Sequence, residues 1–278
     1  MKVPGSDFMK TLNPGKMIWQ DIERIRAERP LVHNITNYVV MNTTANALLA
    51  IGASPVMAHA IEEVEEMVSL AGALVINIGT LSTPWVKAMI KAGKKAHRRK
   101  IPVVLDPVGC GATRFRTTVA QEIMREAAPT IIRGNASEIS SLLGHEAGTR
   151  GVESRQTPDQ VMDEARALST SARCVVSVSG PVDLVVEGNV VVRISNGHPM
   201  MAKVTGMGCT ASAIMGAFAA ANPQSLKAAA HAMAVMGIAG EMAAERSAGP
   251  GSFQMHFLDA LSVVRESDIA RRLKMEGG

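Results

Sequence analysis

Apolar runs and amphipathic stretches alternate between about residue 60 and residue 180. The clearest apolar runs are 74–78, 103–105, 130–132 and 174–178. Each is short and consists mostly of Val, Ile and Leu, which is typical of strands buried on both faces of a parallel sheet. The stretches between them predict helices near 62–71, 83–98, 115–127, 136–143 and 157–170. This alternation predicts an α/β fold with a wound, mostly parallel sheet.

The pattern changes after residue 180. Two apolar runs, 184–187 and 190–194, flank Gly188-Asn189 and predict a hairpin with a tight turn. From residue 209 to about residue 264 the pattern is almost entirely helical, with breaks at Pro223 and at the Gly249-Pro250-Gly251 cluster. Since we find no internal repeat and no linker, the sequence predicts one domain over 16–278, preceded by a loose tail over 1–15.

The composition narrows the class of protein. Of the 278 residues, 47% are hydrophobic but only 3% are aromatic, so the core must be aliphatic and rich in methionine. The net charge of +4 is modest and suits a small anionic ligand, and the dense basic run at 94–100 is typical of a solvated helix end. We therefore expect no nucleic-acid partner, because that function favours a basic face with aromatic stacking residues.

The sequence also favours a cytoplasmic location. No segment reaches the roughly 18 apolar residues of a membrane span, and the first 15 residues lack the apolar core of a signal peptide. The three cysteines form no C-x-x-C pair, and no histidines cluster at metal-ligand spacing. An odd number of cysteines without such patterns is natural in a reducing compartment. We expect neither a membrane partner nor a disulfide.

Polar residues and glycines follow each predicted strand of the parallel sheet. Gly79 follows the first, Asp106 the second, Arg133 the third and Ser179 the fourth. In open α/β sheets, ligands bind outside the carboxyl ends of the strands. We therefore expect these residues to meet along one edge and to form a binding site there.

The segment Gly206-Met207-Gly208-Cys209 precedes a helical run of small residues. The bare backbone of Gly206 and Gly208 can bring N–H groups against a phosphate at a helix start, as in an anion hole. In many small-molecule kinases, an aspartate at the position of Cys209 takes the proton from the substrate hydroxyl. A helix N-terminus also lowers the pKa of a thiol, which favours an ionised Cys209.

Other interpretations of this segment stay open from the residues alone. Cys209 can be a small buried residue, or a covalent nucleophile if a histidine lies within reach. The segment also matches the G-x-G-x-x-A dinucleotide fingerprint, but no acid follows about 20 residues later to bind a ribose. The sequence contains no G-x-x-x-x-G-K-[ST] motif, which excludes a P-loop.

Several polar residues have both a structural and a functional interpretation. Asp106 can cap a turn or face a metal–phosphate complex, since Mg²⁺ is held through one or two carboxylates, waters and phosphates. Glu138 lies three residues after Asn135, as in a capping box, and can also bind a metal-bound water. Arg133 can grip a phosphate or pair with a surface acid. Asn34, in a cluster of Asn and Thr residues, can cap a helix or line a polar pocket.

These segments, in this order, resemble the hydroxyethylthiazole kinase family, ribokinase-like enzymes of thiamine salvage. The resemblance covers about 30–264 and depends on the segments 32–37, 52–57, 77–81, 105–109, 132–135 and 206–209. It implies a ribokinase-like three-layer sandwich, with a mostly parallel central sheet flanked by helices. It also implies ATP-dependent phosphorylation of the hydroxyl of 4-methyl-5-(2-hydroxyethyl)thiazole, for thiamine biosynthesis by salvage.

The resemblance also implies roles for individual residues. Met57 and the backbone of Gly206 contact the thiazole, and Arg133 contacts ATP. Ser179 contacts ATP as well, where the family usually has threonine, so the hydroxyl is kept. Cys209 faces the substrate hydroxyl.

The resemblance further implies a metal and an assembly. Asp106 and Glu138 organise Mg²⁺, largely through water. Members of the family form homotrimers with active sites at the subunit interfaces. The resemblance therefore implies a homotrimer here, which composition alone does not indicate.

Three alternatives remain. The first is a ribokinase-like kinase of another small alcohol, such as hydroxymethylpyrimidine, against which the cysteine in the glycine-rich segment argues. The second is a nucleotide-dependent dehydratase, which would lack the segments around Asn34 and Met57. The third is a non-catalytic nucleotide- or thiazole-binding protein, which the set Asp106, Arg133 and Glu138 disfavours.

Overall fold

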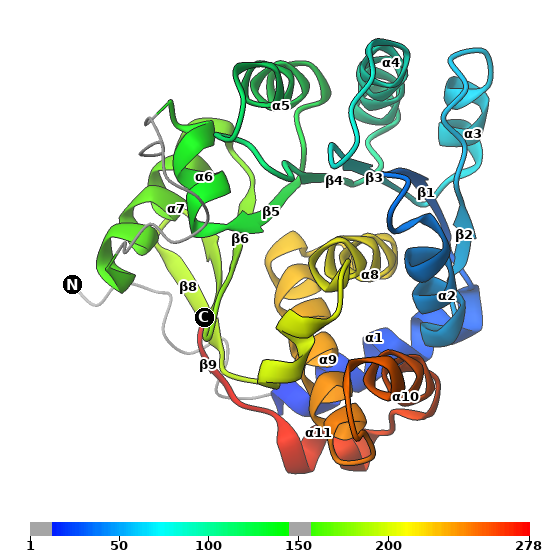
Figure 1. Ribbon diagram of the computed structural model, residues 1–278, viewed down its shortest axis with the longest axis vertical. Helices are drawn as coiled ribbons and strands as arrows, with labels where there is room; N and C mark the ends of the chain where they lie inside the picture. The colour runs from blue at the N-terminus through cyan, green and yellow to red at the C-terminus, as the bar shows by residue number, and fades with distance from the viewer. Residues whose placement is uncertain (1–12, 145–156) are drawn as a thin grey trace.

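A nine-stranded sheet forms the centre of the molecule (Figure 1). The computed structural model describes residues 13–144 and 157–278. The strands are β1 (Leu31–Ile35), β2 (Ser54–Val56), β3 (Ala73–Asn77), β4 (Val103–Asp106), β5 (Ile131–Asn135), β6 (Val175–Ser179), β7 (Asp183–Glu187), β8 (Val190–Ile194) and β9 (Met275–Gly277). Their order is β2-β1-β3-β4-β5-β6-β7-β8-β9, parallel from β2 to β6 and antiparallel from β6 to β9.

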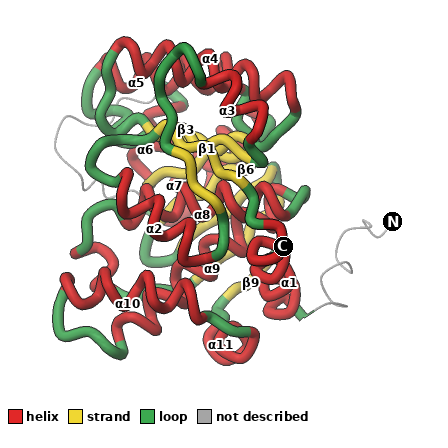
Figure 2. The backbone as a smooth tube through the Cα atoms, turned by 90° about the vertical axis from the view of Figure 1, so that its right-hand side faces the viewer, coloured by secondary structure: helices red, strands yellow, loops and turns green. Residues whose placement is uncertain are grey.

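Two layers of helices cover the sheet. The helices are α1 (Pro14–Glu28), α2 (Met41–Ile51), α3 (Val64–Leu70), α4 (Thr83–Arg99), α5 (Arg114–Ala127), α6 (Ala136–Leu142), α7 (Pro158–Ala172), α8 (Met207–Ala221), α9 (Ser225–Ala244), α10 (Pro250–Val263) and α11 (Glu266–Arg272), with the 3-10 helix η1 (Pro199–Lys203) before α8. The strands lie between α3, α4 and α5 on one side and α8, α9 and α10 on the other (Figures 1 and 2). None of the helices within 13–144 and 157–278 has the length and apolar character needed to cross a bilayer.

The parallel strands β1 and β3 to β6 each contribute to two hydrophobic cores. Successive side chains of a strand point to opposite faces, so Val75 packs in the core under α8 and α9, while Leu74 and Ile76 pack in the core under α4 and α5. This explains why the strands appear as continuous apolar runs. The predicted α/β sandwich with a mostly parallel sheet is confirmed.

The predicted elements within 60–194 are confirmed with small shifts of their bounds. The four predicted strands are β3 to β6, the hairpin is β7 and β8, and the five predicted helices are α3 to α7. Gly188 has a φ of 57° at the hairpin turn, a backbone conformation that glycine adopts without strain. The pattern did not reveal β1, which carries His33 and Asn34, or the three-residue strands β2 and β9.

Two predicted boundaries differ from the structure. Pro14 and Gly15, assigned to the tail, begin α1, with Asn13 as its N-cap; residues 1–12 of the predicted tail lie outside the described residues. The Gly249-Pro250-Gly251 cluster does separate two helices, but Pro250 and Gly251 belong to the first turn of α10. Proline is well tolerated there because the first N–H groups of a helix have no intrahelical partner.

Candidate active site

The carboxyl ends of the parallel strands place the predicted polar residues along one edge of the sheet. Asn77 at the end of β3 pairs in register with Asp106 at the end of β4. Asn135 at the end of β5 pairs with Ser179 at the end of β6. Helix α8 packs against β1, β3 and β4 (Figure 1), which brings Cys209, in its first turn, to this edge.

A chain of hydrogen bonds links Cys209 to Asp106 through two asparagines. Asn37 Nδ2 donates to the Cys209 sulfur at 3.5 Å and to Asn77 Oδ1 at 2.8 Å. Asn77 Nδ2 donates in turn to Asp106 Oδ2 at 2.8 Å, and Ser212 Oγ donates to the same oxygen at 2.7 Å. The thiol and the carboxylate therefore belong to one polar network.

Backbone donors fix the direction of this chain. Gly79 N donates to Asn77 Oδ1 at 3.0 Å, and Val39 N donates to Asn37 Oδ1 at 3.1 Å. Because a backbone N–H can only donate, both amide oxygens are identified, and both amide nitrogens must face along the chain. The Cys209 sulfur is thus an acceptor, a role that stabilises a thiolate.

Asp106 is almost completely buried, with 1% of its surface exposed. Burial raises the pKa of this carboxyl from 3.8 to about 6, while the nearby charge of Arg133 opposes the rise. Its Oδ1 is buried without a hydrogen-bond partner among the described residues. A buried acceptor without a partner is costly in a protein that binds nothing at this place, and it suits an atom that receives a ligand.

Cys209 lies at a helix N-terminus, but the expectation that the pKa of its thiol is lowered there is wrong. Burial, with the charge of Asp106 as the next cause, raises the pKa to about 11. The described histidines do not provide a base, because none is hydrogen-bonded to this sulfur; His33 contacts Ala58 O and His231 contacts Asp21. The geometry does not favour the covalent-nucleophile alternative.

Glu138 forms the predicted capping box of α6 and a second contact. Asn135 accepts a hydrogen bond from Glu138 N, and Glu138 Oε2 accepts from Asn135 N at 2.8 Å. Glu138 Oε1 accepts from Gly109 N at 2.8 Å, in the loop that follows Asp106. No group of three or more His, Cys, Asp or Glu within 13–144 and 157–278 could hold a metal ion by itself. The carboxylates of Asp106 and Glu138 therefore fit a Mg²⁺ site only if water molecules and substrate phosphates provide the other ligands.

Arg133 lies beside the first turn of α8. Its Nη2 donates to Ser179 Oγ at 2.8 Å, and its buried Nε has no partner among the described residues. A Cβ added at Gly208 would lie 2.5 Å from Arg133 Nη1. Glycine at position 208 is therefore required for the guanidinium to approach the helix N-terminus, and together they concentrate positive charge at one point.

A cavity of about 630 Å³ opens beside this point. Arg133, Ser179 and Gly208 line it, together with Asp183 at the start of β7. Burial raises the pKa of Asp183 to about 6, and its Oδ1 accepts a hydrogen bond from Gly180 N at 3.0 Å. The remaining lining residues come mainly from the 195–202 segment and α9, which the sequence patterns did not assign to a site.

Sequence reasoning also missed Arg116 on α5. Its guanidinium donates to Val108 O at 2.7 Å, to Gly79 O at 2.7 Å and to Ile78 O at 2.9 Å. These carbonyls belong to the loops after β3 and β4, so one side chain ties the two loops together. Arg116 lies in the run 115–127, which predicts an ordinary amphipathic helix, and no sequence signal distinguishes it from the other arginines.

The predicted substrate residues lie farther along the same edge. His33 pairs with Val56; Asn34 is the next residue of β1, and Met57 directly follows the end of β2. Met57 is half-buried, whereas Asn34 is 1% exposed and its Nδ2 donates to Val32 O at 2.9 Å. Gly206 caps α8 with a φ of 82°, and a Cβ there would lie 2.7 Å from Val40 Cγ1. Contacts of these residues with a thiazole stay a prediction.

The fold is that of ribokinase-like proteins. The solved structure of the pyridoxal kinase from Staphylococcus aureus in complex with AMP-PCP and pyridoxal aligns with a TM-score of 0.59 and 13% identity. The alignment covers 77% of this chain and 88% of that chain, and at this identity it shows the shared fold alone.

Closer relatives identify the family. The model of the hydroxyethylthiazole kinase family matches residues 22–267. A hydroxyethylthiazole kinase of Syntrophus aciditrophicus is 58% identical over 261 residues, covering 94% of this chain and 97% of that protein. The solved structure of a hydroxyethylthiazole kinase protein from Pyrococcus horikoshii aligns with a TM-score of 0.88 and 45% identity, over 95% of this chain and 99% of that one. The chain belongs to the hydroxyethylthiazole kinase family.

Proposed function

We propose that this protein transfers the terminal phosphoryl group of ATP to the hydroxyl of 4-methyl-5-(2-hydroxyethyl)thiazole. The observation that carries the proposal is the convergence of three parts at the first turn of α8. These parts are the positive guanidinium of Arg133, the bare backbone of Gly208, and the sulfur of Cys209 at the end of its chain to Asp106.

ATP binds in the cavity lined by Arg133, Ser179 and Gly208, with its phosphates directed to the N-terminus of α8. Phosphoryl transfer passes through a loose transition state that carries charge on the phosphoryl oxygens. Arg133 and the N–H groups of the first helical turn stabilise that charge and align the phosphate with the hydroxyl. Most of the rate enhancement comes from these groups.

Cys209 is placed to take the proton of the attacking hydroxyl. Its high pKa leaves little thiolate at neutral pH, so proton transfer contributes little to the rate. The N–H of Asn37 that faces the sulfur stabilises what thiolate there is.

Asp106 and Glu138 would hold Mg²⁺ through water and the phosphates of ATP. The unpartnered Oδ1 of Asp106 supports this role, and so does the contact of Glu138 with the loop after Asp106. The ion would neutralise charge on the transferring phosphoryl group.

Met57, Gly206 and Asn34 form the thiazole side of the site in this proposal. The register of β1 and β2 supports it, because Asn34 and Met57 directly follow the paired residues His33 and Val56. We further propose a cytoplasmic homotrimer with active sites at the subunit interfaces. Exposed apolar side chains close to the substrate side, at Tyr38 and Val39, support an interface there, and three free cysteines suit a reducing compartment.

One assay tests the function. The protein is incubated with ATP, Mg²⁺ and either the thiazole alcohol, hydroxymethylpyrimidine or pyridoxal, and ADP and the phosphorylated products are measured. We expect product from the thiazole alcohol at the highest kcat/KM. Product from another alcohol but none from the thiazole would overturn the proposed substrate, and nucleotide binding without any product would indicate a binding protein.

A further inference from the structure

One wall of the 630 Å³ cavity is a short segment without regular structure. Ser195, Asn196, Gly197 and His198 form this wall segment between β8 and η1, and all four line the cavity. A loop wall of this kind needs fixed contacts to keep its shape, because its backbone makes few regular hydrogen bonds.

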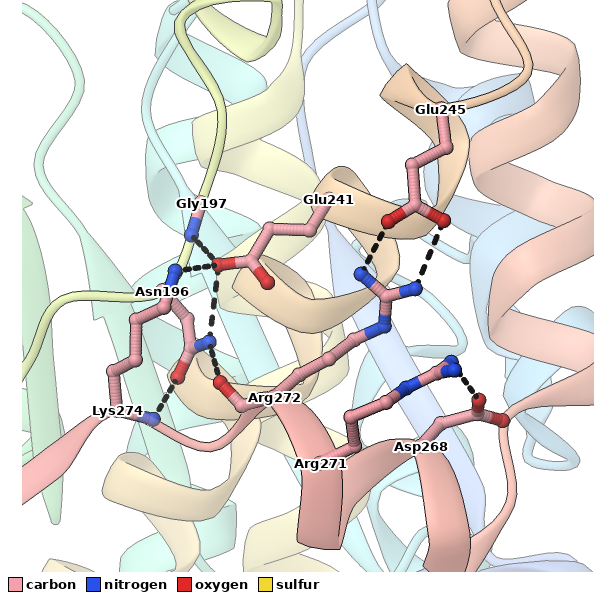
Figure 3. Close-up of polar contacts among 8 residues, drawn as sticks. All are labelled: Asn196, Gly197, Glu241, Glu245, Asp268, Arg271, Arg272 and Lys274. Atoms are coloured by element: carbon pink, nitrogen blue, oxygen red, sulfur yellow. Dashed lines mark hydrogen bonds and ion pairs between the residues drawn. The ribbon is translucent and has the colours of Figure 1, made fainter.

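The side chain of Asn196 is fully occupied by protein groups. Its Nδ2 donates to Glu241 Oε1 at 3.1 Å and to Arg272 O at 2.7 Å, and its Oδ1 accepts from Lys274 N at 2.8 Å (Figure 3). Both amide hydrogens are used, so Asn196 has no donor left for a ligand. Its side chain fixes the wall and does not bind through the amide group.

Glu241 on α9 is the acceptor that joins the wall segment and Lys274 to this helix. Its Oε1 accepts from Gly197 N at 3.2 Å and from Lys274 Nζ at 2.9 Å, in addition to Asn196 Nδ2 (Figure 3). Only 13% of its side chain is exposed. A single carboxylate oxygen thus holds the wall segment and the 272–274 segment against α9.

The backbone of α9 is shaped for this contact. A Cβ added at Gly237 would lie 2.6 Å from the backbone carbon of Asn196, and one added at Gly240 would lie 2.5 Å from Met201 Sδ. Gly237 itself lines the cavity. The wall segment therefore lies directly on the helix that carries Glu241, without an intervening side chain.

From these contacts we infer that Glu241 is a positioning residue for the nucleotide: it fixes the wall segment through Asn196 and Gly197 and so sets the affinity for ATP. This inference rests on the proposed function in one respect, that the cavity is the nucleotide site. Loosening the wall weakens nucleotide binding but leaves the thiazole side, at the other end of the edge, unchanged.

Glu245 provides a matched control one turn further along α9. Its carboxylate pairs with Arg272 at 2.7 and 2.8 Å, but 59% of its side chain is exposed, and it makes no hydrogen bond or ion pair with the wall segment among the described residues (Figure 3). Glu241→Gln and Glu245→Gln remove the same charge from the same helix. Of the two carboxylates, only that of Glu241 accepts hydrogen bonds from the described residues of the wall segment.

The experiment measures KM for both substrates, kcat, and the Kd for ADP by calorimetry, on the wild type and both variants. We expect Glu241→Gln to raise KM for ATP and Kd for ADP about fivefold, as a charge-assisted hydrogen bond becomes neutral. KM for the thiazole alcohol and kcat should stay within twofold, and Glu245→Gln should match the wild type throughout. Unchanged ATP and ADP values in Glu241→Gln, or an equal rise in both KM values, would overturn the inference.

Two further measurements keep the test decisive. If Glu241→Gln does not fold, Lys274→Met, which removes one partner of Glu241, must give the same selective rise, and no rise would overturn the inference. A wild type that binds ADP but forms no thiazole phosphate would overturn the proposed function. The ratio of the Kd for ADP in Glu241→Gln to that in the wild type would still decide this inference. A wild type that does not bind ADP would overturn both.

Discussion

Replacing Cys209 with aspartate should raise the turnover number, contrary to the usual result of changing a catalytic residue. Burial and the charge of Asp106 raise the pKa of the thiol to about 11. At pH 7.5, a thiol with that pKa is ionised in about one molecule in 3,000. The wild type therefore gains little of the roughly 10²–10⁴-fold that a general base can contribute.

An aspartate at position 209 is ionised at pH 7.5 and can accept the proton directly. We expect kcat to rise about tenfold, less than the roughly 10²–10⁴-fold that a general base can contribute, because a carboxylate is a weaker base than a thiolate. The wild-type rate should increase between pH 7 and pH 9 as the thiolate population grows, whereas the Cys209→Asp rate should be nearly constant over that range.

Coupled detection of ADP at saturating substrates measures both profiles. Cys209→Ser is the control, since its hydroxyl does not ionise in this range and its rate should not rise with pH. A Cys209→Asp variant that folds, binds ATP and forms no detectable product would refute the reasoning. A wild-type rate with no pH dependence would refute the proton-acceptor role as well.

Three other changes have definite expected results. Asp106→Asn should reduce turnover and yet raise the free energy of unfolding at pH 7.5 by up to about 3 kcal/mol, since burial raises the pKa of Asp106 from 3.8 to about 6 and each pKa unit corresponds to about 1.4 kcal/mol. This gain should grow between pH 4 and pH 6 and vanish below pH 4, where the carboxyl is protonated in both states. Gly208→Ala should raise KM for ATP about tenfold, because its Cβ would displace the Arg133 guanidinium. Asp21→Ala should lower the free energy of unfolding by about 2–4 kcal/mol without changing either KM, because the buried His231 loses its 2.6 Å partner.

Urea denaturation and initial rates at varied ATP check these results. A loss of stability in Asp106→Asn at pH 7.5 would contradict the assigned cost of burying that carboxylate. An unchanged KM for ATP in Gly208→Ala would remove Arg133 from the nucleotide site. Changed KM values in Asp21→Ala would show that this buried cluster is coupled to the active site.

The sheet was predictable because a strand that is buried on both faces needs apolar side chains at nearly every position. The predicted runs that correspond to β3 to β6 consist mostly of Val, Ile and Leu, and short runs of this composition are typical of strands buried on both faces. β1 escaped prediction because His33 and Asn34 interrupt its apolar run, although both side chains are buried. His33 Nε2 contacts Ala58 O, a tertiary contact that no local pattern encodes, and Asn34 Nδ2 donates to Val32 O, while His33 Nδ1 and Asn34 Oδ1 have no partner among the described residues.

The active site was predictable as a set of strand ends but not as a network. No sequence pattern distinguishes Asn37 and Asn77 from the other asparagines of the chain. The direction of their hydrogen bonds depends on the backbone N–H groups that donate to their side-chain oxygens. The pKa of Cys209 illustrates the same limit. The helix N-terminus and burial act in opposite directions, and only the packed structure reveals that burial prevails.

The contact between Asn196 and Lys274 has a consequence for the order in which the protein is made. These residues are 78 positions apart in the chain, and contacts between distant segments form late because loop closure costs entropy. On the ribosome, strands β1 to β8 emerge before residue 274 is synthesised, so the growing chain can assemble most of its sheet while Asn196 lacks its acceptor and donor from the 272–274 segment. The cavity wall thus gains these contacts only after residues 272–274 have been synthesised, and a stalled chain that ends before residue 272 should bind a ligand there more weakly.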